Sequence, residues 1–261
     1  MTYIIALANQ KGGVAKTTTT SALGGALTKC GKEVLLVDMD AQADLTLAFG
    51  YDPKSVRHSI ADVLFSSTDL VSITRETAVP GLDLLPANAD LQLADRFLTL
   101  RPNYEFILRD TLRKGVPLIY DFVILDCPPA MSTVTLNGLH AADLLIVPTQ
   151  PEFFSTHALR NVIAAARRTQ GAGNPGLLYR ILVTMLDRRN RIHRELSEQL
   201  RATFGDNILD SIIEVDTRLR ESCIEGLPIT HFAPKTRSAQ QYQALAEEIV
   251  RYAQETVPQQ A

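Results

Sequence analysis

The chain has 261 residues, 46% of them apolar, and a formal net charge of -3 at pH 7. This length and apolar content are enough for one substantial hydrophobic core, and no stretch rich in Pro, Gly and Ser divides the chain into independent halves. We therefore predict one domain over residues 1–257 and a frayed tail over residues 258–261.

The charge balance and the cysteines restrict the class of protein further. Acidic side chains outnumber basic ones in the first 150 residues and the rest of the chain is close to balanced, so any attraction to nucleic acid must come from a local patch. Cys30, Cys127 and Cys223 are too widely spaced for a metal-binding motif or a disulfide framework, which fits a reducing cytoplasm. No basic leader precedes the first apolar run, and no run approaches the ~20 residues that span a bilayer. We expect a soluble, cytoplasmic protein.

Short apolar runs alternate with amphipathic segments of helical length. The runs typical of buried strands are residues 3–8, 34–37, 122–125, 144–147 and 181–185, and the helical candidates are residues 17–29, 89–99, 104–113, 154–169, 191–204 and 238–253. This alternation predicts an α/β fold with a doubly wound, mostly parallel sheet and helices on both faces. In such a sheet, ligands bind outside the carboxyl ends of the strands.

A phosphate-binding loop follows the first of these strands. Gly12 and Gly13 can turn backbone amides inward, and the start of the next helix adds free N–H groups and a positive dipole. Lys16 would reach the β- and γ-phosphates of a nucleotide, and the Thr17 hydroxyl would bind Mg²⁺. The complete set of expected phosphate-binding residues is Lys11, Gly12, Gly13, Val14, Ala15, Lys16, Thr17 and Thr18.

The ordinary P-loop pattern has glycines where this chain has Gln10 and Ala15. With Lys11 at its start, the loop resembles the deviant Walker A box of the ParA/MinD family, and the similarity to ParA and Soj partitioning ATPases covers nearly the whole chain. The resemblance implies ATP as ligand and a role for Lys11 at the phosphates of a second subunit. The family usually has Gly in place of Ala15, whose Cβ would cost roughly 1 kcal/mol at a positive φ.

Carboxylates follow two of the predicted strands. Asp38 and Asp40 end the strand 34–37, and Asp126 ends the strand 122–125. By resemblance, Asp40 orients the attacking water, Asp38 lies near the magnesium shell and Asp126 is the Walker B residue that holds a magnesium-bound water. A single Asp at a strand end can instead be a helix cap or a turn residue. Lys11, Lys16 and Asp40 are thus the expected catalytic residues, and Thr17, Asp38 and Asp126 the expected metal site.

The resemblance also places a base-binding loop late in the chain. Relatives pack the adenine with a loop that commonly has Pro and Asn where this chain has Glu214 and Asp216. Met185, Glu214 and Asp216 are the expected base contacts. Asp216 could accept from the adenine amino group, but a carboxylate cannot donate back to a ring nitrogen as an amide can.

Six arginines form a candidate DNA-binding surface, because ParA relatives bind DNA without sequence preference through these two regions. They are Arg188, Arg189, Arg191, Arg194, Arg218 and Arg220. Guanidinium groups suit phosphate contacts, and a dimer would double the contacts on one face. The alternative is a solvated helix face with local pairs such as Arg191 with Glu195 or Arg194 with Glu198.

The leading hypothesis is a ParA-type ATPase with slow intrinsic turnover that forms a homodimer with ATP, associates with the nucleoid and positions a plasmid, chromosome or other cargo. A ParB-like or other adaptor would stimulate hydrolysis. Three other classes stay open: a MinD-like ATPase on a membrane, an electron-transfer ATPase with an iron–sulfur cluster, and a regulator that binds ATP without hydrolysing it. The first of these needs a basic amphipathic terminal helix, whereas residues 249–256 are short and polar.

Overall fold

The computed structural model describes residues 2–66, 68–114, 118–153 and 155–256, so the predicted tail lies outside the described residues. Within them, one eight-stranded sheet has the order β3-β4-β2-β5-β1-β6-β7-β8. The strands are β1 Tyr3–Leu7, β2 Val34–Asp38, β3 Arg75–Glu76, β4 Leu82–Leu85, β5 Phe122–Asp126, β6 Leu144–Thr149, β7 Leu178–Leu186 and β8 Ile208–Glu214. Only the pairing of β3 with β4 is antiparallel, which confirms the predicted mostly parallel sheet.

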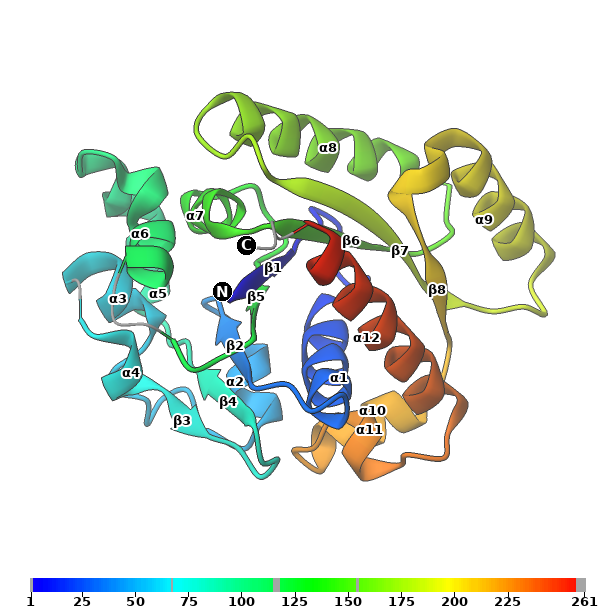
Figure 1. Cartoon of the computed structure of the whole chain (residues 1–261), viewed down its shortest axis with the longest axis horizontal. Coiled ribbons are helices and arrows are strands. Elements are labelled where there is room, and N and C mark those ends of the chain that lie inside the picture. The colour runs from blue at the N-terminus through cyan, green and yellow to red at the C-terminus, as the bar shows by residue number, and fades with distance from the viewer. Residues whose placement is uncertain (1, 67, 115–117, 154, 257–261) are drawn as a thin grey trace.

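Helices cover both faces of this sheet (Figure 1). On one face lie α1 Lys16–Lys29, α2 Asp44–Ala48, α10 Arg218–Ile224, α11 Ile229–Phe232 and α12 Arg237–Thr256, with α1 packed along α12. The other face carries α3 Ile60–Ser66, α4 Leu70–Ile73, α5 Leu91–Phe97, α6 Ile107–Lys114, α7 Thr133–Ala141, α8 Ser155–Gly171 and α9 Arg191–Phe204. Three short 3₁₀ turns, Leu98–Leu100, Tyr104–Phe106 and Gly205–Asn207, extend or precede these helices.

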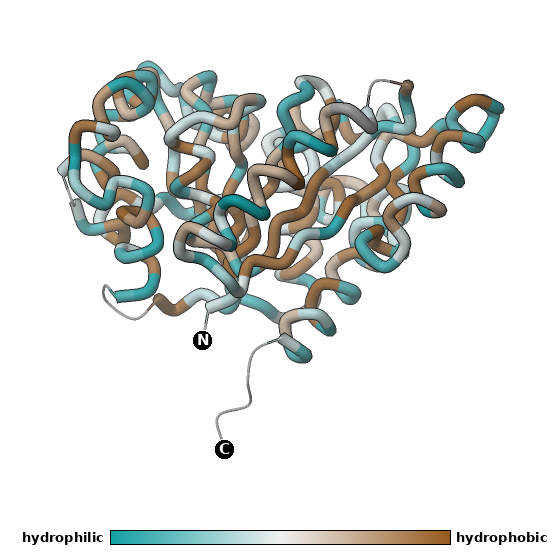
Figure 2. Tube along the Cα trace, turned by 90° about the horizontal axis from the view of Figure 1, so that it is seen from above, coloured by the Kyte–Doolittle hydropathy of each residue, from teal (hydrophilic) through white to brown (hydrophobic). Residues whose placement is uncertain are grey.

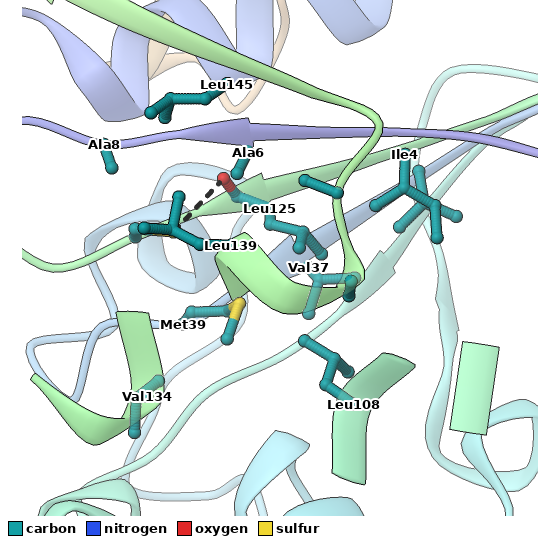
Figure 3. Packing of buried hydrophobic residues seen from close by; sticks show 14 of the residues in the cluster. Ile4, Ala6, Ala8, Val37, Met39, Leu108, Leu125, Val134, Leu139 and Leu145 are labelled. Carbon is teal, nitrogen blue, oxygen red and sulfur yellow. Dashed lines mark hydrogen bonds between the residues drawn. The ribbon is translucent and has the colours of Figure 1, made fainter. Parts of the chain in front are cut away.

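Strand alternation divides the hydrophobic core into two halves. Ile4, Leu35 and Val123 belong to the core on the α7 and α8 face, whereas Ile5, Leu36 and Ile124 belong to the core under α1 and α12. Hydrophobic positions follow the strands through the middle of the molecule (Figure 2). Figure 3 shows Val37, Leu125 and Leu145 from three strands gathered with Leu108 and Leu139 from two helices. Both faces of the sheet are therefore buried, as near-continuous apolar runs indicate.

The five predicted strands are all present, but the sequence reading omitted several elements. β3 and β4 are two and four residues long, and the polar residues Asp210 and Ser211 interrupt the apolar residues of β8, so none of the three gives a long apolar run. The late loop expected around Glu214 and Asp216 is short, because α10 begins at Arg218. The helix expected over residues 104–113 begins as a 3₁₀ turn after Asn103, whose φ is 54°.

The sheet ends at β8, and α12 covers its backbone donors. The N–H groups of Asp210 and Ser211 donate to the Glu248 carboxylate at 2.8 and 3.1 Å, and the N–H of Glu214 donates to Gln241 at 3.0 Å. Among the described residues, no helix combines the length and apolar character needed to cross a membrane.

Candidate functional site

The loop between β1 and α1 lies at the carboxyl end of the central strands. Leu7 of β1 and Asp38 of β2 both align with Asp126 of β5, so the loop and the two carboxylates meet at one edge of the sheet. Gly13 has a φ of 71°. The first turn of α1 has no side-chain cap and no acidic residue, so its N–H groups face the loop without a competing anion. This arrangement is a cradle for phosphate.

Ala15 adopts the left-handed conformation that the sequence left open. Its φ is 65° and its ψ is 36°, and it stands directly before α1. Its carbonyl accepts the Thr19 N–H at 2.9 Å, so the helix begins despite the unfavourable conformation. A Cβ in this region costs about 1 kcal/mol relative to glycine.

The two lysines of the loop have different surroundings. Lys16 is buried, with 9% exposure, and its Nζ lies 3.5 Å from the Lys11 carbonyl oxygen. Burial lowers the pKa of Lys16, whereas the nearby Asp126, Cys127 and Asp40 act in the opposite direction. The ammonium group of Lys11 is more exposed and forms an ion pair with Glu152, in the segment after β6. Sequence reasoning did not identify Glu152, because 141 residues separate the partners.

Asp38 and Asp126 form a pair of buried carboxylates, with exposures of 0% and 2%. Burial raises the pKa of Asp38 to about 6, against the effect of hydrogen bonds from Thr46 and Asp40. Burial and, next, the charge of Asp38 raise the pKa of Asp126 to about 7, against hydrogen bonds from Thr17 and Thr20 and the charge of Lys16. Two buried carboxylates at paired positions of adjacent strands favour a cation between or beside them.

Asp38 and Asp126 have different hydrogen-bond partners. Asp38 accepts the Thr46 N–H at 2.8 Å, the Thr46 hydroxyl at 2.7 Å and the Asp40 N–H at 3.1 Å, so it holds the loop from β2 to α2. Asp126 accepts the Thr20 hydroxyl at 3.1 Å and a hydrogen bond from Thr17. Asp126 and Thr17, next to the phosphate cradle, are hard oxygen donors of the kind that Mg²⁺ prefers. The residues present therefore fit a bound magnesium ion.

Asp40 lies at the rim of the site. It is partly exposed, its Oδ1 accepts the Gln42 N–H at 3.0 Å, and its charge acts on Lys16. Within the described part of the chain, the other carboxylate oxygen of Asp40 accepts no hydrogen bond, as a group that orients water requires.

A pocket of about 230 Å³ opens beside the loop. It brings Met185, Glu214 and Asp216 together with Ala15 and Thr18, and its remaining lining residues are Ile213, Val215, Thr217, Leu219, Arg220 and Tyr242. Met185 has a φ of 53°, and Gln150 donates both to the Met185 sulfur and to the Gly13 carbonyl. Gln150, which the sequence reading passed over, therefore links the loop to the pocket.

The two acidic residues of the pocket are already engaged. Glu214 forms ion pairs with Arg188 and Arg237. Asp216 accepts the Arg218 N–H at 3.0 Å and the Ser238 hydroxyl at 2.8 Å. Burial acts to raise the pKa of Asp216, but these hydrogen bonds and the charge of Arg237 leave it lowered. Asp216 stays ionised and can accept a further hydrogen bond.

The arginines of the predicted surface occur in two groups with local partners. Arg189 pairs with Asp187, Arg191 with Glu195 and Arg218 with Glu221. Arg194 donates to the Arg188 carbonyl oxygen at 2.6 Å, and Arg220 lines the pocket. The pair of Arg191 with Glu195, named for the alternative of a solvated helix face, is thus present, but pairs this exposed are weak and solvent or another anion can replace the carboxylate. The Arg189 side chain has 91% exposure.

A lysine–threonine loop after the central strand, facing carboxylates at the ends of the adjoining strands, defines the class of P-loop nucleoside triphosphatases. A family described as AAA domain matches residues 2–178. The chain is 37% identical over 251 residues to the chromosome partitioning protein ParA of Caulobacter vibrioides, covering 95% of this chain and 93% of that protein.

It is also 36% identical over 250 residues to the sporulation initiation inhibitor protein Soj of Bacillus subtilis, covering 95% and 98% of the two chains. A crystal structure of cobyrinic acid a,c-diamide synthase from Mycobacterium smegmatis with bound ATP analog and magnesium has a TM-score of 0.86 and 33% identity, covering 98% of each chain. The chain belongs to the ParA/Soj family of P-loop ATPases.

Proposed function

We propose that this protein binds Mg-ATP at the loop Lys11 to Thr18, dimerises around the nucleotide, and binds DNA in that state without sequence preference. Hydrolysis, stimulated by a ParB-like or other adaptor, returns it to the monomer and releases the DNA. The cycle would position a plasmid, chromosome or other large cargo from the cytoplasm and the nucleoid. The observation that carries the proposal is the convergence of Lys16, Asp126 and the α1 N-terminus on one cradle.

The residues of the cradle suit phosphoryl transfer to water. Lys16 is buried beside the position that the β- and γ-phosphates would occupy, so its charge is poorly screened by solvent. Thr17 and Asp126 would hold Mg²⁺, which neutralises charge that develops on the phosphate oxygens. Asp40, at the exposed rim, would orient the attacking water. Positioning and charge account for most catalysis in this reaction class, so slow turnover by the isolated protein is expected.

The exposure of the ion pair between Lys11 and Glu152 supports a role for Lys11 at the nucleotide of a second subunit. The Lys11 side chain is 28% exposed and that of its partner Glu152 is 47% exposed. An ion pair this exposed contributes roughly 1 kcal/mol or less to stability, so it breaks readily. Lys11 can then exchange a carboxylate in its own chain for a phosphate bound by another copy. Such an exchange would link nucleotide binding to dimerisation.

The base pocket supports a purine nucleotide. Its apolar lining by Met185, Ile213 and Leu219 suits the faces of a flat ring, and Asp216 can accept from an exocyclic amino group. Glu214 lines the same pocket, but its carboxylate is taken up by two arginines, so we do not assign it a hydrogen bond to the base.

The six arginines support DNA binding by charge alone. Arg188, Arg189, Arg191 and Arg194 extend over the segment before α9 and its first turn, while Arg218 and Arg220 begin α10. Phosphate contacts carry no base readout, so affinity should fall steeply with salt and vary little with sequence. Two copies on one DNA would combine their contacts, which makes the dimer the binding form.

The membrane alternative has less support in the C-terminal helix. Ile249 of α12 is fully buried, and Thr256 reaches the Tyr3 hydroxyl, so this end of the helix is docked on the sheet. The iron–sulfur alternative would need accessible thiols, whereas Cys127 is 1% exposed.

The deciding experiment compares four variants with the wild type in ATP turnover, dimerisation and binding to non-specific DNA. Lys16→Ala is expected to abolish nucleotide binding, and Asp40→Ala to trap the DNA-bound dimer. Arg189→Ala should keep ATP-dependent dimerisation and lose most DNA affinity. Arg251→Ala, at an exposed arginine near the far end of α12, is the charge-matched control and should bind DNA like the wild type.

Two results would overturn the proposal. A wild-type protein that has no affinity for ATP in the presence of magnesium, or that stays monomeric when saturated with it, excludes the nucleotide switch. DNA affinity that survives both Arg189→Ala and Arg218→Glu excludes the arginine surface.

A further inference from the structure

Glu214 is a nearly buried carboxylate at which three elements meet. It is the last residue of β8, and its side chain is 7% exposed. Its Oε1 accepts the Arg188 Nε at 2.8 Å and the Gln241 Nε2 at 3.0 Å, and its Oε2 lies 2.9 Å from Arg237. Arg188 belongs to the segment between β7 and α9, and the other two partners belong to α12. One carboxylate thus connects three parts of the chain.

The same residue forms part of the base pocket. Glu214 and the three residues after it, through Thr217, make one wall of the 230 Å³ cavity next to Ala15 and Thr18 of the phosphate loop. A ligand in this pocket restricts the wall that it touches. Because the Glu214 carboxylate is held by guanidinium groups, a shift of the wall is transmitted to Arg188 and Arg237.

The segment that carries Arg188 is joined to this wall at the backbone as well. Leu186, at the end of β7, is the register partner of Glu214, and its carbonyl accepts the Val215 N–H at 3.2 Å. The Arg188 carbonyl in turn accepts from Arg194 at 2.6 Å. A continuous series of hydrogen bonds and ion pairs therefore connects the pocket wall with Arg188 and Arg194.

We propose that Glu214 is a positioning residue that couples the occupancy of the base pocket to the placement of Arg188 and Arg194 in the arginine surface. The inference rests on the proposed function and adds a route between its two binding sites that does not require the dimer. A coupling of this kind is reciprocal, so a change at Arg188 must alter nucleotide affinity even though Arg188 does not line the pocket.

The test titrates Mg-ADP into the full-length protein without DNA, because in the proposed cycle only ATP drives dimerisation. Arg188→Ala is expected to weaken ADP binding by roughly threefold, the size of effect that one half-exposed ion pair can transmit. Arg251→Ala changes the charge equally at a site outside the pocket and the arginine surface, and it should leave the ADP dissociation constant unchanged. Glu214→Gln keeps the size of the side chain and removes its charge.

A double-mutant cycle assigns the effect to the Glu214 carboxylate. In the Glu214→Gln background, Arg188→Ala should cause no further loss of ADP affinity, because the link is already broken. Hydrogen exchange gives a readout that a purely structural role would not change. ADP should protect the backbone amides of Asp187 to Asn190 in the wild type but not in Glu214→Gln, with thermal melting used to verify that the variant is folded.

The outcomes separate this inference from the proposed function. A wild type that does not bind ADP or ATP at all contradicts the proposed function. If the wild type binds ADP but Arg188→Ala binds it equally well, or if the two substitutions weaken binding independently, the coupling through Glu214 is wrong and the nucleotide switch stands.

Discussion

Ala15 concentrates the conformational strain of the phosphate loop in one residue. Its φ of 65° is unfavourable for any side chain with a Cβ, and it directly precedes the helix whose N–H groups face the site. Gly13, two residues earlier, has a φ of 71° without that penalty. Glycine at position 15 should therefore stabilise the loop, and alanine at position 13 should destabilise it.

Ala15→Gly is expected to raise the free energy of unfolding by about 0.5 to 1 kcal/mol, because relief of the left-handed strain exceeds the extra freedom of glycine in the unfolded chain. Gly13→Ala should lower it by about 1 kcal/mol for conformational reasons alone, since an added Cβ would meet nothing within 4 Å. Urea denaturation measures both. A lower denaturation midpoint for Ala15→Gly would contradict the assignment of strain to this residue.

The buried pair Asp38 and Asp126 predicts an unusual pH dependence for the protein without nucleotide and magnesium. Their folded-state pKa values of about 6 and about 7 exceed those of unfolded carboxyl groups. Between about pH 4 and 7 the folded chain therefore binds more protons than the unfolded chain, and this contribution to stability is lost as the pH rises through that window.

Asp126→Asn removes one of the two charges and should stabilise the ligand-free protein at pH 8 by about 1 to 3 kcal/mol. The advantage over the wild type should shrink towards zero near pH 4, where both carboxyl groups are protonated in the folded state. Denaturant unfolding at the two pH values gives the comparison. Equal differences at both values would mean that the substitution acts through packing rather than through charge.

At the scale of elements, α1 depends on close contact with the segment that begins α11. A Cβ at Gly25 would overlap Pro228 and approach the Thr230 hydroxyl oxygen at 2.8 Å. The Thr19 hydroxyl and the Tyr242 hydroxyl, 3.1 Å apart, join α1 to α12 on the same side. The helix that carries Lys16 is thus held in place by its contacts with α12 and with the segment that begins α11.

Gly25→Ala is expected to destabilise the protein by about 1 to 3 kcal/mol, because backbone and ring atoms must move apart. Gly171→Ala, at the end of α8, is the matched control. Nothing lies within 4 Å of its added Cβ, so stability should stay constant or rise by up to about 1 kcal/mol. Thermal denaturation of both variants, with ADP titrations on the folded protein, separates loss of packing from loss of the site.

The sequence predicts those elements that are defined by the pattern of neighbouring residues. The strands of the sheet centre are buried on both sides and read as apolar runs, whereas the polar residues Asp210 and Ser211 interrupt the apolar pattern of β8. In the same way, the phosphate loop is defined by neighbouring residues. Glu152 could not be predicted as the partner of Lys11, because 141 residues separate the two and the pairing depends on how distant loops meet in the folded chain.

At the scale of the molecule, β1 connects the beginning of the chain to its middle. It lies between β5 and β6, so its neighbours come from residues more than a hundred positions later. β2 on one side and β7 on the other extend the same hydrogen-bonded sheet. Removing any central strand would expose both halves of the core.

We therefore propose that residues 1–257 unfold as one cooperative unit. Calorimetry should give a single transition whose calorimetric and van't Hoff enthalpies agree. Circular dichroism and tyrosine fluorescence, usable because the chain has no tryptophan, should give coincident urea transitions. Two resolved transitions would instead indicate separate domains.

The way α12 covers β8 also determines how copies of the protein can meet. Edge strands attract strands from other molecules through unused backbone groups, but Glu248 and Gln241 already occupy donors of β8 along its length. A second copy finds few amides there to continue the ladder. The β8 rim is thereby protected against cross-β growth, so the nucleotide-controlled dimerisation that we propose would use the loops at the carboxyl ends of the strands.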